Sequence, residues 1–357
     1  LDPKALILSL KARMNGIDAD KPLIDGIVSK DALWSCTTCG ACTKVCPAQI
    51  PTPDIIVQMR RHLALEEGDF PEGLDQALEN TSSVGNPWGM DPASRLDWAK
   101  GLDVPVATEG KPVDYLYWVG CSASYDRRAQ KIARSMVKIL QAAGVSFAVM
   151  REERCHGDFA RRSGEEYTFQ LAALENIENL HKYQFKRILA HCPHCFNTLK
   201  NEYPQFEGGK FDVVSHTQLI SELLESGRIK PKLKQAEKIV FHDPCYMARY
   251  NNSVGTPRKI LDGIEGITRV ENLQRGKTAM CCGAGGGQMW MESSTKKINF
   301  IRLTDLRRSA STVAVGCPHC LTMFESAMSD DKVLSGMDIV ELSELVAKGL
   351  DDADQNR

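Results

Sequence analysis

Residues 281–287 read Cys281-Cys282-Gly283-Ala284-Gly285-Gly286-Gly287, two adjacent cysteines followed directly by a glycine-rich turn. Three further cysteines flank this stretch in the C-terminal half: Cys245 lies before it, and Cys317 and Cys320 lie after it. Zinc takes four tetrahedral ligands, so five cysteines exceed what a structural zinc site needs. Iron–sulfur clusters are also held by cysteine thiolates. The pattern therefore predicts a polynuclear iron–sulfur cluster in this half of the chain.

The glycines of this turn could serve either a nucleotide or a cluster. A dinucleotide-binding loop reads G-x-G-x-x-G, but Gln288 stands where the last glycine is required. Glycine has no Cβ, so a glycine-rich backbone can approach another group closely. We therefore expect Gly283, Gly285 and Gly286 to bring the backbone against the cluster, as cofactor-binding residues.

A second cysteine motif lies near the N-terminus, where Cys36, Cys39, Cys42 and Cys46 are followed by Pro47. This is the C-x2-C-x2-C-x3-C-P run of bacterial ferredoxins, which holds [4Fe–4S] cubane clusters. In two-cluster ferredoxins the fourth cysteine of such a run ligates the other cluster. Either the four cysteines hold one cluster together, or a partner motif lies upstream or in another subunit. The start at a residue other than methionine favours a chain shortened at its N-terminus.

Around this motif we expect a short amphipathic helix over residues 5–14 and a second helix that begins near Asp54, with Asp54 as its N-cap behind Pro53. Residues 68–112 are rich in glycine, proline and aspartate, which predicts an irregular connector. Trp88 and Trp98 in that connector are expected to be packing residues.

The chain repeats itself from residue 113, with a spacing of 124 to 126 residues between matching positions. Both halves contain Cys-Pro-His-Cys, and a near-constant spacing over several positions indicates a duplication. The matches are Cys121 with Cys245, Cys155 with Cys281, His156 with Cys282, Cys192 with Cys317, and Cys195 with Cys320.

The two halves differ in chemistry because His156 replaces the second cysteine of the pair. Cys121, Cys155, Cys192 and Cys195 would still suffice for a cubane, and His156 could assist as a ligand, as histidines do in Rieske centres. The alternative is an empty site with a structural role. Four histidines next to the cysteines are expected to donate hydrogen bonds or to pack, without ligating: His191, His194, His242 and His319.

Short apolar runs alternate with helical patterns in both halves, which is typical of parallel α/β units. We expect strands over 115–119, 145–149, 187–190, 238–241 and 312–315, and helices over 127–142, 165–180 and 298–306. The cysteines follow strand ends, where open α/β sheets place ligands. The predicted fold class is α/β: an α-helical ferredoxin-type segment (1–67), a connector (68–112) and two pseudo-symmetric α/β lobes (113–230 and 231–357).

Composition excludes several classes of function. A net charge of −2 and a pI near 6.5 over 357 residues do not indicate nucleic acid as a partner. The longest apolar runs are far shorter than the ~20 residues of a membrane span, and no signal peptide is visible. The thirteen cysteines have ligand-like spacings, which predicts a reducing, cytoplasmic compartment in place of a disulfide framework.

The five-cysteine motif resembles the cysteine-rich CCG domain of heterodisulfide reductase catalytic subunits. This resemblance implies a noncubane [4Fe–4S] cluster on the five cysteines of the second lobe, and His156 departs from the full pattern in the first. Four stretches are similar to the electron-transfer-flavoprotein:menaquinone oxidoreductase branch: residues 33–42, 86–89, 192–204 and 281–291. Members of that branch usually carry an N-terminal membrane part with b-type haems and a first ferredoxin motif, which are absent from this sequence.

The resemblance implies an iron–sulfur oxidoreductase that works within a complex, with the second-lobe cluster as the candidate centre and no catalytic side chain assigned. Electrons would pass from an electron-transfer flavoprotein toward a membrane haem b or menaquinone partner, through cubane and noncubane clusters. The chain would be peripherally membrane-associated through that partner. The alternatives are a heterodisulfide reductase catalytic subunit and a relay subunit of a lactate or glycolate oxidase complex.

Overall fold

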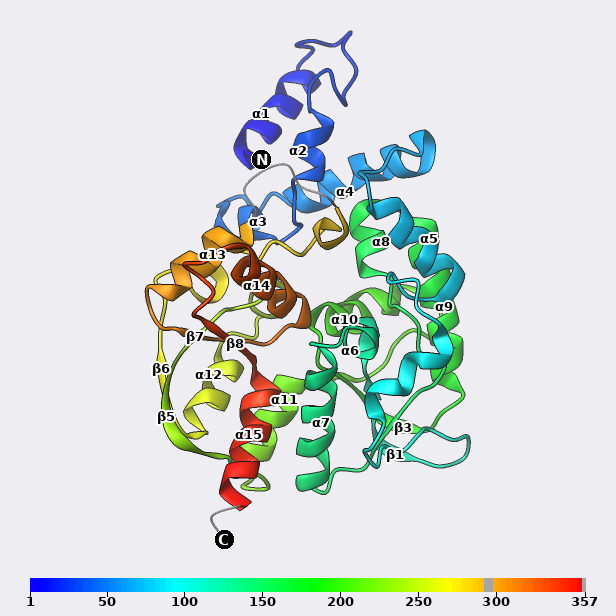
Figure 1. Cartoon of the computed structure of the whole chain (residues 1–357). Helices are drawn as coiled ribbons and strands as arrows, with labels where there is room; N and C mark the ends of the chain where they lie inside the picture. Colours follow the sequence, from blue (N-terminus) through cyan, green and yellow to red (C-terminus); the bar gives the residue numbers. More distant parts are fainter. Residues whose placement is uncertain (292–297, 355–357) are drawn as a thin grey trace.

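The computed structural model describes residues 1–291 and 298–354, so the last three residues of the second lobe lie outside it. Figure 1 shows a helical N-terminal region next to two α/β lobes. The N-terminal helices are α1 (Pro3–Met14), α2 (Lys30–Trp34), α3 (Ala41–Val45) and α4 (Thr52–His62), which continues as a π-helical turn over Leu63–Glu67.

The first predicted helix is present as α1, capped by the carboxylate of Asp2, which accepts hydrogen bonds from the backbone of Lys4 and Ala5. The next helix is present near its predicted start, but the predicted N-cap is wrong, because Pro51 and not Asp54 is the N-cap. Helix α4 begins at Thr52, with Pro53 and Asp54 inside its first turn. The first N–H groups of a helix have no partner within it, so proline, which lacks an N–H, is tolerated in the first turn. Pro53 therefore lies inside the helix, whereas the prediction placed it before the helix.

The connector is more regular than predicted. Helix α5 (Leu74–Val84) and a 3-10 helix over Pro92–Ala99 occupy much of it. Gly73 and Gly85 both have positive φ and bracket α5 without entering it, and one face of the helix is buried at Leu74, Ala77, Leu78 and Thr81. The two glycines mark the ends of a helix. The glycine, proline and aspartate content of the whole stretch predicted irregular structure throughout.

The two lobes have the same topology. Each contains a four-stranded parallel sheet, ordered β2-β1-β3-β4 in the first and β6-β5-β7-β8 in the second. Counted within each lobe, the order is second, first, third, fourth strand in both. The α/β prediction of two pseudo-symmetric lobes is confirmed. The strands are β1 (Val113–Trp118), β2 (Phe147–Val149), β3 (Phe185–Ala190), β4 (Val213–Ser215), β5 (Lys232–Phe241), β6 (Glu265–Val270), β7 (Thr312–Val315) and β8 (Asp338–Glu341).

Helices connect the strands and cover the sheets. Those of the first lobe are α6 (Gly120–Tyr125), α7 (Gln130–Ala142), α8 (Asp158–Ser163), α9 (Glu166–His181), α10 (Pro193–Asn197) and α11 (His216–Glu225). Those of the second are α12 (Gly255–Asp262), α13 (Ile298–Arg307), α14 (Pro318–Asp330) and α15 (Leu342–Asp354). Single π or 3-10 turns lie at Thr198–Glu202, Tyr203–Gln205, Tyr246–Tyr250, Gly276–Thr278 and Gln288–Trp290.

One apolar core runs through both lobes. Met136 of α7, Leu219 of α11, Ile260 of α12 and Val346 of α15 belong to the same cluster of buried side chains, and Figure 1 shows α7, α11 and α15 between the two sheets. The lobes are also joined by a buried ion pair 2.9 Å long between His216 Nε2 and Glu341 Oε1. Among the residues that the structure describes, no helix is both long and apolar enough to cross a membrane.

Candidate metal centre

The ends of the parallel strands position the cysteines of both lobes. Cys121 and Cys245 follow β1 and β5, and Cys192 and Cys317 follow β3 and β7 as the N-caps of α10 and α14. The backbone therefore delivers thiols from neighbouring strands to one edge of each sheet, as expected for ligands of open α/β folds. All thirteen cysteines are free thiols.

The five cysteines of the second lobe form one continuous buried group. The Sγ atoms of Cys282 and Cys320 are 3.2 Å apart. Cys281 contacts both Cys245 and Cys282, and Cys320 also contacts Cys317. A hydrogen bond from Cys281 lowers the pKa of Cys282 well below the ordinary thiol value. The thiolate is the metal-binding form of cysteine, so Cys282 is suited to ligation, whereas burial raises the pKa of Cys320 well above the ordinary thiol value.

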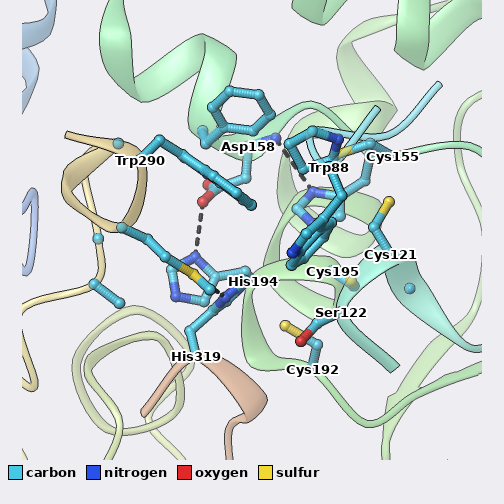
Figure 2. A pocket seen from close by; sticks show the side chains of 18 of the residues that line it. Trp88, Cys121, Ser122, Cys155, Asp158, Cys192, His194, Cys195, Trp290 and His319 are labelled. Carbon is cyan, nitrogen blue, oxygen red and sulfur yellow. Dashed lines mark hydrogen bonds and ion pairs between the residues drawn. The ribbon is translucent and has the colours of Figure 1, made fainter. Parts of the chain in front are cut away.

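The four cysteines of the first lobe line a cavity of about 50 Å³. Cys121 contacts Cys155, and Cys192 contacts Cys195. In Figure 2 the labelled cysteines lie toward the right of the view, and His194 and His319 lie to their left. Beyond the cysteines and these two histidines, the cavity is lined by His156, Asp158, Phe159, Trp88, Trp290 and the glycines of residues 285–287, among others.

His156 lies where the sequence placed it, at the first-lobe cysteines. Its Nδ1 accepts a hydrogen bond from the backbone N–H of Asp158 at 3.3 Å, and burial lowers the pKa of His156 to about 4. The ring is therefore neutral near pH 7, as a metal-binding imidazole must be. Trp98 is packed in the core as expected, and Trp88 packs edge-on against Trp290 with 4.9 Å between ring centroids while also bordering the cavity.

Cys36 and Cys46 of the ferredoxin-type motif have different neighbours. Cys36 interacts electrostatically with Cys39 and Cys42. The Cys46 thiol instead accepts hydrogen bonds from the backbone amides of Ile50, Ala48 and Gln49, which lower its pKa. Whether all four cysteines hold one cluster or Cys46 serves another stays a prediction.

Two contacts between thiols join the three cysteine sets. Cys39 of the ferredoxin-type segment contacts Cys281 of the second lobe. Cys192 of the first lobe contacts Cys317 of the second. The segment is fastened at this point, since Arg249 Nε donates to the carbonyl of Cys39 at 2.6 Å and Tyr250 Oη donates to that of Thr38 at 2.6 Å.

The histidines of the two Cys-Pro-His-Cys motifs cross between the lobes. His194 contacts Cys317, and His319 contacts Cys192; their rings meet edge to face at 4.9 Å. Burial disfavours a charged His194, but Asp158, 2.7 Å from Nδ1, outweighs it and raises the pKa of His194 well above its ordinary value. Each motif therefore places an imidazole against a cysteine of the other lobe.

The glycine-rich turn approaches the ferredoxin-type segment. A Cβ on Gly285 would lie 2.4 Å from the carbonyl oxygen of Thr37, and a Cβ on Gly286 would lie 2.4 Å from that of Cys36. The glycine-rich turn thus approaches another group closely, as expected. In the structure that group is the backbone of Cys36 and Thr37.

Two fully buried arginines were not anticipated from the sequence. Arg60 of α4 donates to the carbonyls of Leu33, Trp34, Cys36, Arg162 and Gly286, so it ties together all three parts of the chain. Arg302 of α13 lies beside His242. A signal was present, because Arg60 shares the apolar face of its helix with Ile56 and Leu63, as Arg302 does with Leu306.

The chemistry of the donor groups fits iron–sulfur clusters. Buried, mutually contacting thiols outnumber what one zinc ion takes, and soft thiolate sets are typical of Fe–S sites. Two parallel α/β lobes with cysteines at their strand ends, joined to a ferredoxin-type segment, define an iron–sulfur protein of the electron-transfer class.

Comparisons with known proteins identify the family. The cysteine-rich domain family CCG matches residues 115–200 and 239–325, and the 4Fe-4S dicluster domain matches residues 7–50. A subunit of the dihydromethanophenazine:CoB--CoM heterodisulfide reductase of Methanosarcina barkeri is 32% identical, over 90% of this chain and 78% of that protein. The chain belongs to this family of CCG-domain iron–sulfur oxidoreductases.

Two further relatives are similar over most of this chain. The "Probable iron-sulfur-binding oxidoreductase FadF" of Bacillus subtilis is 40% identical over 91% of the chain and 48% of that protein. The EtfAB:quinone oxidoreductase of Syntrophomonas wolfei is 33% identical over 93% of the chain and 48% of that protein. The chain thus spans about half the length of these two relatives.

Proposed function

We propose that this chain passes electrons from a flavoprotein of the electron-transfer-flavoprotein class toward a membrane haem b or menaquinone partner. Cys36, Cys39 and Cys42 would hold a cubane cluster whose fourth ligand is Cys46 or a cysteine of a partner motif, and the five second-lobe cysteines a noncubane [4Fe–4S] cluster. The four first-lobe cysteines with His156 would hold a further cluster. When bound, such clusters take up and release electrons at potentials that the surrounding protein sets.

The contact between Cys39 and Cys281 carries this proposal. It joins a ligand of the ferredoxin-type set to a ligand of the second-lobe set, while Arg249 and Tyr250 fix the backbone on the ferredoxin side. Cys192 and Cys317 join the remaining set. The chain's own residues thus arrange all three donor sets as one contiguous group. Electron transfer from one partner to another requires clusters that lie close together in this way.

Names of relatives support the identity of the partners. One is called an EtfAB:quinone oxidoreductase, and quinones reside in the bilayer. We therefore place the chain at the cytoplasmic side of a membrane, held there by its partner.

The test is to mix the anaerobically reconstituted chain with reduced electron-transfer flavoprotein and to follow cluster bleaching by stopped-flow absorbance. We expect fast reduction that saturates with flavoprotein concentration. The control is a Cys39→Ser, Cys281→Ser double variant, which removes one proposed ligand from each of the two clusters, so the bleaching should be lost. A wild-type sample with complete iron and sulfide that is not reduced would refute the flavoprotein as donor.

Disulfide reduction is the second candidate, favoured by the cavity between the lobes. Cys192, His194 and Cys195 of the first Cys-Pro-His-Cys motif and His319 of the second line it, and one relative is named as part of a heterodisulfide reductase. Disulfide-dependent reoxidation of the dithionite-reduced chain would establish this activity, and reoxidation by a quinone analogue alone would exclude it in favour of the first.

A further inference from the structure

His242 lies directly after β5, at the edge of the second-lobe cysteine set. Its backbone N–H donates to the carbonyl of Ala314 in β7 at 2.9 Å. Its ring stands edge-on to Phe324, with 4.9 Å between centroids and 75° between planes. The residue is only 1% exposed. Backbone pairing and ring packing therefore hold the imidazole in one place.

Arg302 decides which ring nitrogen carries the proton. Its Nε lies 3.3 Å from His242 Nδ1, and a guanidinium can only donate. Nδ1 must therefore be the acceptor, which leaves the proton on Nε2. Arg302 is itself fixed, by Asp305 at 2.8 Å and by the carbonyl of Gln274 at 2.9 Å.

The resulting Nε2–H has a free hydrogen bond to give. Nε2 is buried and has no hydrogen-bond partner within residues 1–291 and 298–354. An unsatisfied buried donor costs about 1–3 kcal/mol, so an acceptor is expected. A ring nitrogen of His242 and the Sγ atoms of Cys282 and Cys320 all lie within 4.8 Å of one another, and sulfur is the acceptor at hand.

The first lobe shows a related arrangement at the matching position. With Cys121 aligned to Cys245, Trp118 takes the place of His242 at the end of the first strand. Its indole Nε1 is also buried without a partner in the same described part of the chain. An indole N–H can only donate. Both lobes thus retain a ring N–H donor here, although the rings differ.

We propose that His242 is a hydrogen-bond donor to the sulfur atoms of the second-lobe cluster, not a ligand, and that Arg302 acts as the positioning residue that fixes this tautomer. The proposal rests on the proposed function, since it requires the second-lobe cysteines to hold that cluster. Ligation by Nε2 would require the proton on Nδ1, against the N–H of Arg302. Reduction adds negative charge to the sulfurs, so the donor raises the reduction potential.

The first experiment separates a donor from a ligand. His242→Phe, which keeps a ring but no N–H, is compared with His242→Gln, which keeps an amide N–H near the position of Nε2. We expect both variants to retain wild-type iron per chain. The potential of the second-lobe cluster, titrated by electron paramagnetic resonance, should become more negative in His242→Phe and return toward wild type in His242→Gln. Loss of iron in both variants, or an unchanged potential in His242→Phe, would overturn the proposal.

The second experiment does not depend on the cluster. Nitrogen-15 NMR of the cluster-free chain, labelled at histidine, reports the tautomer of His242 directly. We expect the Nε2–H form in the wild type and a mixture in Arg302→Met, which removes the guanidinium. An Nδ1–H form in the wild type would overturn the inference while leaving the proposed function intact. Absence of iron from the reconstituted wild type would refute the proposed function and, with it, the hydrogen bond to cluster sulfur, while the tautomer that Arg302 fixes would stand.

Discussion

The two lobes have the same backbone topology and differ in the side chains that it brings to the metal-binding positions. Strand order is the same, and both place Cys-Pro-His-Cys after the third strand. Yet His156 stands in the first lobe where Cys282 stands in the second, and the first set borders a cavity while the second forms one continuous thiol group. The fold therefore fixes where donor groups are delivered, and single residues decide which donor groups those are.

Exchanging the differing residue should have the largest effect. Cys282→His gives the second lobe the donor pattern of the first. Because the change removes one of five contacting thiols, we expect the second-lobe cluster signal to be lost, together with up to ~4 iron atoms per chain. Iron analysis and electron paramagnetic resonance measure this.

The reciprocal variant His156→Cys completes the five-cysteine pattern in the first lobe and should add a signal of the second-lobe kind. Cys282→Ser is the matched control, because it removes the thiol without introducing an imidazole. If Cys282→His kept both the iron and the signal, the difference between the lobes would not depend on this position.

A smaller effect is expected where the second lobe meets the ferredoxin-type segment. Gly286→Ala places a Cβ 2.4 Å from the Cys36 carbonyl at a φ of +69°. Overpacking together with left-handed strain predicts a loss of about 2–4 kcal/mol in the free energy of unfolding. Urea denaturation measures it.

Gly110→Ala is the control for the strain alone, since Gly110 has a φ of +76° with open space around it. It should cost about 1–2 kcal/mol. Equal losses of unfolding free energy in the two variants would show that the backbone at Gly286 shifts to accept a Cβ at no steric cost.

The smallest effect concerns the ion pair that joins the lobes. Burial alone would raise the pKa of Glu341, but His216 and Ser343 outweigh it and lower that pKa below its ordinary value. The stabilisation is therefore present above the unfolded pKa of about 4.3 and is lost as the pH falls through the lower folded pKa.

The free energy of unfolding, measured by urea denaturation from pH 7 to pH 3, should fall more for the wild type than for Glu341→Gln. The difference should be about 1.4 kcal/mol for each unit by which the folded pKa of Glu341 lies below its unfolded pKa. Parallel curves for the two chains would mean that the pair does not link folding to protonation.

Much of this organisation could be predicted from the sequence because its signals are local or repeated. The spacing of Cys121 and Cys245 revealed the duplication, and apolar runs before the cysteines located β1, β3, β5 and β7. The assignment of individual cysteines to clusters stays a prediction.

The missed features depend on contacts between distant segments. The approach of Gly286 to Cys36 joins residues 250 positions apart, and the crossing of His194 and His319 requires knowledge of how the lobes face each other. Helix α5 was missed for another reason: Gly73 and Gly85 lie outside it, and composition cannot distinguish a boundary from an interior.

The hydrogen bonds of Arg60 have a consequence for how the molecule comes apart. One side chain satisfies carbonyls of the N-terminal region, of the first lobe at Arg162 and of the second lobe at Gly286. Separating any of these regions leaves a buried cation short of acceptors, which is costly. Amide hydrogen exchange in the three regions should therefore report one shared opening event, so that the chain unfolds as a single cooperative unit.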